Sequence, residues 1–207
     1  SKFSYIKIKN YLIRLFFLTS RRILMNKYFS GLLTTFFIIF ISMSANSDGH
    51  INLKYFATAK LYLEPNMMMV GDREPLVNVD KEESYIETAD GARWEALNPC
   101  ADWLVLQASG VFNLDVRCIA KAEDGSIVRI DYIGRAYPHD TGAEKMGAGD
   151  LIKAEDMYFR TAPTMKTLSE KYSWINTTMF VGEMVELQFF NENGKRPYVM
   201  YKWYAVQ

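Results

Sequence analysis

Two acidic side chains, Asp102 and Asp115, are the candidates in this sequence for acid–base chemistry. A carboxyl group acts as a general base or acid near neutral pH when dry surroundings raise its pKa. Arg160 can hold a carboxylate, enolate or phenolate of a ligand in a bidentate pair, or it can form an internal ion pair with either acid. A nearby arginine lowers a carboxyl pKa, so the second alternative would oppose acid–base use of Asp102 or Asp115.

Aromatic and polar side chains recur at alternate positions of segments that are expected to be strands. Residues two apart in a strand share a face, so we expect Tyr172, Trp174 and Asn176 on one face and Tyr158 with Arg160 on another. Flat rings beside a few polar groups suit a ligand pocket. The sequence therefore predicts a ligand-binding wall made of the side chains Trp103, Arg117, Tyr158, Arg160, Tyr172, Trp174 and Asn176.

The direction in which the polar faces point decides whether this wall exists. Asn113, Asp115 and Arg117 share one face of their segment, and the residues between them are apolar. If the apolar faces pack outward, the polar faces line a lumen; if they pack inward, the polar residues form a solvated exterior. The aromatic members of the wall favour a polar lumen. A core filled by Trp103, Trp174 and their neighbours is the third alternative.

Metal and nucleophile chemistry have little support in the sequence. The two histidines, His50 and His139, and the two cysteines, Cys100 and Cys118, are scattered and lack the spacing of zinc ligands. No nucleophile motif accompanies His139, and no glycine-rich phosphate loop follows a predicted strand. We therefore expect neither a metal site nor a cofactor.

The chain beyond residue 50 is predicted to consist of short strands joined by turns. Its clearest element is a hairpin, in which residues 111–122 and 126–135 alternate on either side of an Asp-Gly turn. A three-residue loop over 123–125 would set Arg117 opposite Asp131, whereas a two-residue loop would not.

Many short strands with regular turns indicate a sandwich or a barrel. A closed barrel suits sequential hairpins because it leaves no exposed strand edge. We therefore predict an all-β fold, a single antiparallel β-barrel over residues 51–207. The stretch 137–150 contains several glycines and is predicted to be a loop, of a length usual in lids or mobile segments. The remaining predicted strands include 156–162, 172–181, 185–190 and 198–206.

Residues 25–46 are predicted to be a signal peptide or a membrane anchor. A short positive region precedes an apolar run over 31–45, and small residues follow, so cleavage is expected after Ser44 or Ala45. Cleavage would leave a periplasmic or secreted protein; an uncleaved segment, slightly short of a membrane span, would anchor it. Residues 1–24 are predicted to be an upstream extension that does not fold.

The charge and the cysteine content limit which partners and which cellular compartment are expected. After Asn46 the chain carries 17 basic and 24 acidic side chains, a net charge of −7, which repels phosphate backbones and argues against a nucleic-acid partner. An exported chain can form a disulfide. Cys118 lies in a predicted strand and Cys100 in a turn-like stretch, and nothing in the sequence brings them together, so two unpaired thiols are favoured.

Four motifs of this sequence occur together in one known family. They are Pro99-Cys100-Ala101-Asp102-Trp103, Asp124-Gly125, Tyr158-Phe159-Arg160-Thr161-Ala162-Pro163 and Tyr172-Ser173-Trp174-Ile175-Asn176. With them the chain resembles the proteins called domain of unknown function 3237, over residues 53–206. The resemblance implies a single antiparallel β-barrel of lipocalin-like (calycin-like) shape and no established activity. The chain departs from the family pattern at Cys100, where a glycine is usual, and in its predicted signal segment.

The first functional hypothesis is an exported barrel that binds a small, partly aromatic or apolar molecule in its lumen. The alternative is an isomerase, cyclase or lyase type of enzyme that uses Asp102 or Asp115 as a general acid or base. The expected partner is a small molecule, with a membrane contact only through an uncleaved N-terminal segment. The sequence leaves open whether the protein forms a homo-oligomer.

Overall fold

The described part of the chain is almost entirely antiparallel β-structure. The computed structural model describes residues 51–192 and 194–207. The predicted extension 1–24 and the predicted signal or anchor segment 25–46 lie outside the described residues. Within the described part, no helix is both long and apolar enough to cross a membrane.

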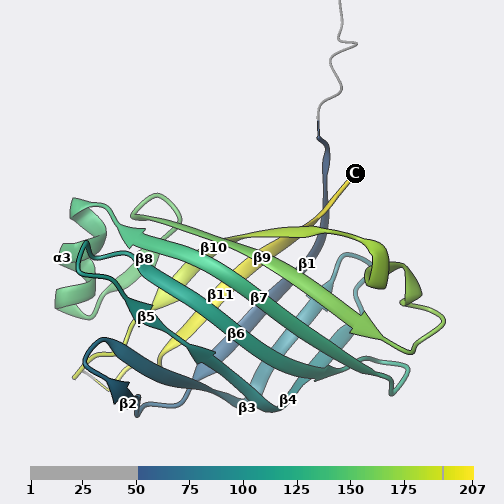
Figure 1. The fold of residues 1–207 in the computed structure, drawn as a ribbon, viewed down its shortest axis with the longest axis horizontal. Coiled ribbons are helices and arrows are strands. Elements are labelled where there is room, and N and C mark those ends of the chain that lie inside the picture. Colours follow the sequence, from purple (N-terminus) through teal and green to yellow (C-terminus); the bar gives the residue numbers. More distant parts are fainter. Residues whose placement is uncertain (1–50, 193) are drawn as a thin grey trace, which may run out of the picture. The chain divides into compact units, whose positions relative to one another are not determined.

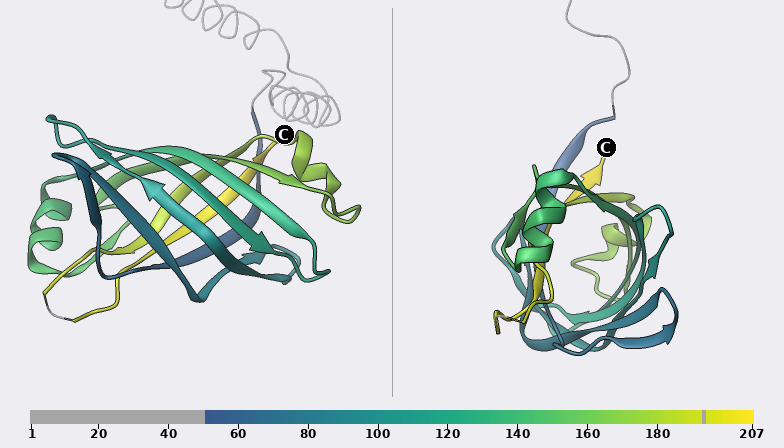
Figure 2. Two further views of the ribbon diagram at one scale, coloured as in Figure 1. Left: turned by 60° about the horizontal axis from the view of Figure 1, so that its bottom comes forward. Right: turned by 90° about the vertical axis from the view of Figure 1, so that its left-hand side faces the viewer.

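Eight strands close into a ring, which confirms the predicted single antiparallel β-barrel (Figure 1). Each strand pairs antiparallel with the next, and a pairing between β1 and β3 closes the ring, as the end-on view in Figure 2 shows. Closure leaves none of these strands as an open edge. In ring order the strands are β1 (Leu53–Leu63), β11 (Tyr198–Val206), β10 (Phe180–Gln188), β9 (Met157–Thr167), β7 (Ile127–Pro138), β6 (Phe112–Lys121), β4 (Arg93–Trp103) and β3 (Glu74–Thr88).

The hairpin of β6 and β7 has the longer of the two loops that the sequence allowed. The backbone N–H of Ala122 donates to the carbonyl of Ser126, which leaves residues 123–125 as a three-residue loop. Gly125 has a φ of 82°, a conformation that glycine adopts without strain. Arg117 accordingly lies opposite Asp131.

Five short elements lie outside the ring: β2 (Met68–Gly71), β5 (Val105–Leu106), β8 (Leu151–Lys153), the helix α3 (Asp140–Ala148) and the 3₁₀ helix η1 (Ser173–Thr177). The prediction of a loop over 137–150 is wrong in part, because α3 occupies most of it. This helix ends at Gly149, whose left-handed conformation lets its N–H bond to the carbonyls of Lys145 and Met146. Its nine residues show no strong apolar periodicity, so the sequence pattern did not reveal it.

The predicted strand over 172–181 is also wrong in its first half. Tyr172 precedes η1 and the next strand begins only at Phe180. The Asn176 side chain accepts a hydrogen bond from the backbone N–H of Thr167 and donates one to its carbonyl. These bonds take the place of strand pairing and favour a tight turn. Tyr172, Trp174 and Asn176 therefore do not share a strand face.

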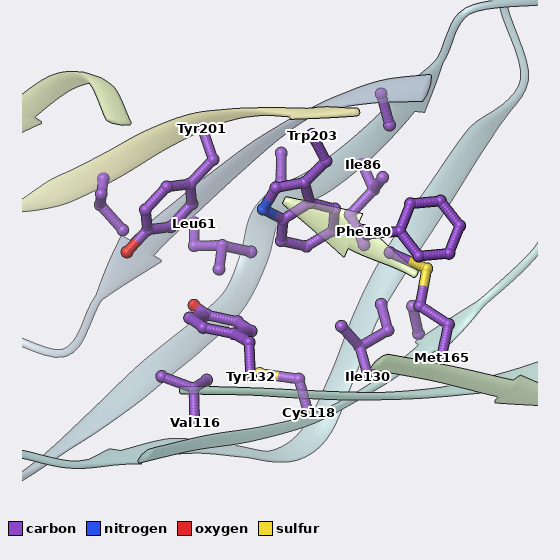
Figure 3. Close-up of a cluster of buried hydrophobic side chains, with 14 of the residues drawn as sticks. Leu61, Ile86, Val116, Cys118, Ile130, Tyr132, Met165, Phe180, Tyr201 and Trp203 are labelled. Atoms are coloured by element: carbon purple, nitrogen blue, oxygen red, sulfur yellow. The ribbon is translucent and has the colours of Figure 1, made fainter. Parts of the chain in front are cut away.

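The barrel packs its apolar faces inward, so the predicted polar lumen is wrong. Along β9, buried and exposed residues alternate without interruption from Met157 to Thr167. The same alternation on β6 puts Leu114 and Val116 inside and Arg117 outside. Among the described residues, no second layer of structure covers the outside of the ring, so apolar side chains are buried in the lumen, and Figure 3 shows part of this core.

Cys100 and Cys118 form a disulfide, which corrects the preference for two unpaired thiols. Cys100 belongs to β4 rather than to a turn, and Cys118 lies on the neighbouring strand β6. The pairing register of these strands shifts between Leu97 and Ala101. This irregularity brings the two sulfur atoms together, and the sequence pattern contained no sign of it.

Candidate functional site

The lumen has two different halves. Around η1 it is filled by a cluster of rings, which we call the filled half: Phe56, Trp94, Tyr172, Phe180 and Trp203. Their ring centroids lie 5.0 Å apart for Trp94 and Tyr172, 5.1 Å for Phe56 and Phe180 and 5.8 Å for Phe56 and Trp94. At these distances the rings pack on one another and leave little space for a ligand.

Towards α3 the lumen contains a cavity of about 80 Å³, which we call the chamber. Helix α3 lies across one side of the barrel opening there (Figure 2, right) and contributes Met146 to the chamber. The other walls are almost wholly apolar. They include Val77, Leu114, Val116, Ala136, Met157, Phe159, Leu187 and Phe189.

One carboxyl group, that of Asp102, faces the chamber. The pairing of β4 with β6 sets Asp102 opposite the lumenal Val116. Its Oδ1 accepts a hydrogen bond of 3.0 Å from the backbone N–H of Asp115. Burial raises the pKa of Asp102 to about 7, and the charge of Asp115 adds to this effect, while the hydrogen bond opposes it. Asp102 therefore exchanges its proton near neutral pH.

Two buried tyrosines, Tyr132 and Tyr201, face the same chamber, and their rings lie edge-on with centroids 5.9 Å apart. Tyr132 lies opposite Val116 in the pairing of β6 with β7, so Asp102, Val116 and Tyr132 form one row across three strands. Tyr201 comes from β11, across the ring from β6. Figure 3 shows both hydroxyl groups on the same side of the core cluster. Burial, with the charge of Asp102 as a further cause, raises the pKa of both phenols, so they stay protonated.

Neither tyrosine is among the site residues predicted from the sequence. Tyr132 occupies an inward position of the hairpin, and the correct loop length sets it opposite Val116. The three-residue loop was one of the two predicted alternatives, and it sets Arg117 opposite Asp131. The next pair of residues in the same register is Val116 with Tyr132. Tyr201 belongs to an aromatic stretch with tyrosines on both faces, and only the closed ring assigns it to the lumen.

Three predicted site residues near Asp102 lie outside the barrel. Trp103 is 47% exposed. Arg117 lies over its ring at 5.8 Å and forms an ion pair of 3.4 Å with Asp115. Of the two candidate acids, only Asp102 therefore faces the lumen.

Tyr158 and Arg160 also lie on the exterior, on the exposed face of β9. The Tyr158 ring stacks on Tyr137 with centroids 5.0 Å apart, and the Arg160 guanidinium lies 5.3 Å from the Tyr158 centroid. Arg160 forms its ion pair with Glu183 at 3.8 Å. The predicted internal ion pair of Arg160 with Asp102 or Asp115 is therefore wrong.

Tyr172, Trp174 and Asn176 lie in η1 or next to it, at the other end of the barrel from α3 (Figure 1). Tyr172 and Trp174 border a surface cleft of about 420 Å³ together with Lys54 and Tyr55. Tyr172 is buried behind this cleft, and Trp174, which is 44% exposed, packs edge-on against Phe56. The cleft has more space than the chamber, but its charged side chains are solvated, so it lacks a group prepared for chemistry.

The described residues contain no cluster of three or more His, Cys, Asp and Glu side chains that could hold a metal ion. The chemistry available at the chamber is therefore that of one carboxyl and two phenols in apolar surroundings. A half-buried acid with a raised pKa beside hydrogen-bond donors can bind a polar group of a ligand or move a proton.

Comparison with known proteins identifies relatives without a known activity. The family model described as "Protein of unknown function (DUF3237)" matches residues 51–206. An uncharacterised UPF0311 protein of Clostridium acetobutylicum is 30% identical over 80 residues, which are 39% of this chain and 51% of that protein. The chain thus spans about half the length of this relative.

Solved structures share the fold. A conserved protein of unknown function from Rhodopseudomonas palustris matches with a TM-score of 0.64 and 17% identity, over 77% of this chain and 99% of that one. A β-barrel-like protein from Acinetobacter baumannii matches with a TM-score of 0.59 and 21% identity, over 79% of this chain and 100% of that one. At these identities the likeness supports the barrel fold alone.

Proposed function

This chain belongs to the family of unknown function DUF3237, and we propose that its barrel binds a small, partly aromatic or apolar molecule in the chamber. One observation carries the proposal: a single carboxyl and a pair of phenols face an otherwise apolar space inside the barrel. Apolar walls with a few convergent polar groups are typical of small-molecule sites.

The arrangement of polar groups sets the orientation of the ligand. Among the described residues, the backbone N–H of Asp115 donates a hydrogen bond to Oδ1 of the Asp102 carboxyl. The other oxygen is therefore available to a hydroxyl or carbonyl of the ligand, depending on the protonation of Asp102. Tyr132 and Tyr201 supply further donors, and the hydrocarbon part of the ligand would lie against Phe159 and Leu114.

The size of the chamber limits the ligand. A cavity of about 80 Å³ is roughly half of the ~150 Å³ that accommodates benzene in an engineered protein cavity. A ring therefore fits only when side chains at the mouth move. Met146 of α3 and Phe189 after β10 lie at this end, and a methionine adapts its shape at little cost.

Filling the chamber tests the proposal. Ala136→Leu extends a side chain into the chamber, whereas Ala162→Leu adds the same group on the exposed face of β9. We expect Ala136→Leu to abolish binding of the probe ketone 2-indanone, measured by titration, and Ala162→Leu to leave it unchanged. Thermal melting shows whether each variant is folded. Binding that survives in a folded Ala136→Leu protein, or fails in the wild type, would contradict lumenal binding.

We also propose that the barrel is exported. The disulfide between Cys100 and Cys118 supports this, because such bonds persist in oxidising compartments. The apolar segment before residue 46 supports it as well. Mass spectrometry of the protein from separated cell fractions tests both points. Export predicts a non-cytoplasmic fraction with no alkylatable thiol, and reduced thiols in the cytoplasm would contradict it.

A further inference from the structure

We propose that the chamber is a proton-transfer site for an apolar ketone, in which Asp102 moves the proton and the pair Tyr132–Tyr201 binds the carbonyl oxygen. The proposed activity is reversible deprotonation of the ketone to its enolate, and with an unsaturated ketone it becomes a shift of the double bond. This inference rests on the proposed lumenal binding and adds a reaction to it.

The position of Asp102 suits a base. Its backbone lies in the wall of β4, one oxygen is fixed by the N–H of Asp115, and the carboxyl faces the chamber. Neighbouring strands lie ~4.8 Å apart, so the row Asp102–Val116–Tyr132 places the backbones of Asp102 and Tyr132 roughly 10 Å apart. Both side chains face the chamber with Val116 between them, so one ligand in the chamber can contact the carboxyl and the phenol together.

The two phenols suit a carbonyl oxygen. Tyr132 and Tyr201 are 4% and 1% exposed, and their rings lie edge-on with centroids 5.9 Å apart. Each hydroxyl has one hydrogen to donate, so a carbonyl oxygen in the chamber can accept a hydrogen bond from either phenol. Because burial keeps both phenols protonated, they stay donors at the pH at which Asp102 is ionised. Donors fixed in an apolar site stabilise the negative charge that develops on an enolate oxygen.

The proposed step balances without any co-reactant. The Asp102 carboxylate takes a proton from the carbon next to the carbonyl. The electron pair of that C–H bond forms the C=C bond, and the π electrons of the carbonyl move to its oxygen, which accepts the hydrogen bond of the phenol. The Asp102 carboxylic acid then returns the proton to the same carbon, or to the far end of a conjugated double bond.

Exchange of carbon-bound hydrogen tests this directly. The probe is 2-indanone with the full chain in D₂O, followed by loss of the benzylic proton signals in ¹H NMR. We expect the wild type to accelerate exchange over buffer, and the rate to rise with pH through about 7 as Asp102 ionises. Asp102→Asn should lose about 100-fold or more of the acceleration, and Tyr132→Phe and Tyr201→Phe should each lose part of it.

The control variants remove a carboxylate and a phenol from the exterior of the barrel. Asp150→Asn removes an exposed carboxylate and Tyr198→Phe a phenol on the outer face of β11, and both should exchange like the wild type. Titration of 2-indanone against the methionine methyl signals measures binding separately. Binding without accelerated exchange, or exchange that persists in Asp102→Asn, would overturn the activity and leave lumenal binding standing. Absence of binding would overturn both.

Discussion

The filled half and the chamber are built by the same eight strands, but their side chains fit together differently. In the filled half, large rings face small residues: a β-carbon at Gly182 would come within 2.5 Å of Cδ1 of Trp203, so the indole lies directly on that glycine. Ala57 and Ala59 provide similar room. In the chamber, aliphatic side chains such as Leu114 and Val116 meet the rings of Phe159 and Tyr201 without filling the space between them. Large residues matched to small ones seal a barrel, whereas side chains that do not interlock leave space.

Removing a ring from the filled half should have the largest effect. Trp94 is fully buried between Phe56 and Tyr172. We expect Trp94→Ala to lower the free energy of unfolding by about 3–5 kcal/mol, because it creates a cavity. Leu114→Ala should cost about 2 kcal/mol, the low end for such truncations, because its side chain already borders space. Urea unfolding measures both, and equal losses would remove the contrast between the halves.

The disulfide should contribute the next largest effect. Cys100 and Cys118 line a small void together with Tyr132 and Trp203, so the bond braces the wall between the two halves. The bond joins residues 18 apart in sequence. Closing a loop of about this length stabilises a fold by about 3 kcal/mol. We expect the double variant Cys100→Ser with Cys118→Ser to lose about this much in urea unfolding, and unchanged stability would contradict the bracing role.

Adding a methyl group to the filled half should lower the free energy of unfolding by less than removing a ring from it. Gly182→Ala would place a methyl group against Trp203 and Thr161. We expect a loss of about 1–3 kcal/mol, because the indole must shift. At Gly147, on α3, an added β-carbon meets no atom within 4 Å, so Gly147→Ala is the control without a clash. A Gly182→Ala protein as stable as the wild type would show that the filled half is loosely packed.

The pH dependence of the free energy of unfolding should distinguish the chamber from the filled half. The folded protein holds the Asp102 proton up to about pH 7, whereas the ordinary pKa of an aspartate, expected in the unfolded chain, is 3.8. Because the folded state binds more protons between these values, the free energy of unfolding falls as pH rises, by at most about 1.4 kcal/mol per pH unit, and levels off above about 7. Asp102→Asn removes this contribution, so its advantage over the wild type should grow from pH 5 to pH 7. Urea unfolding at several pH values tests this, with Asp150→Asn as control; parallel curves for wild type and Asp102→Asn would contradict the raised pKa of Asp102.

The sequence predicted the ring more successfully than the site. Alternation and the turn at 123–125 are local, and they determine strands, hairpin register and barrel class. Alternation separates two faces but does not say which one is inside. The tyrosine and arginine of β9, Tyr158 and Arg160, looked like a pocket wall, yet they belong to the solvated face.

The remaining errors come from contacts between distant parts of the chain. The Asn176 side chain replaces strand pairing by bonding to Thr167, so a segment rich in strand-forming residues turns instead. Cys100 meets Cys118 through an irregular strand pairing, and Tyr201 reaches Tyr132 only after the ring closes. Of the predicted site residues, Asp102 alone faces the chamber with its acid–base role still open to test.

Methionine methyl groups report on both halves in one experiment. Met146 and Met157 line the chamber, whereas Met165 and Met184 are buried in the core outside it. With ¹³C-methyl methionine in the full chain, titration with 2-indanone should shift the Met146 and Met157 signals in a saturable manner and leave Met165 and Met184 in place. Saturable shifts that are absent from Met146 and Met157, or that appear only at Met165 and Met184, would contradict a ligand site in the chamber.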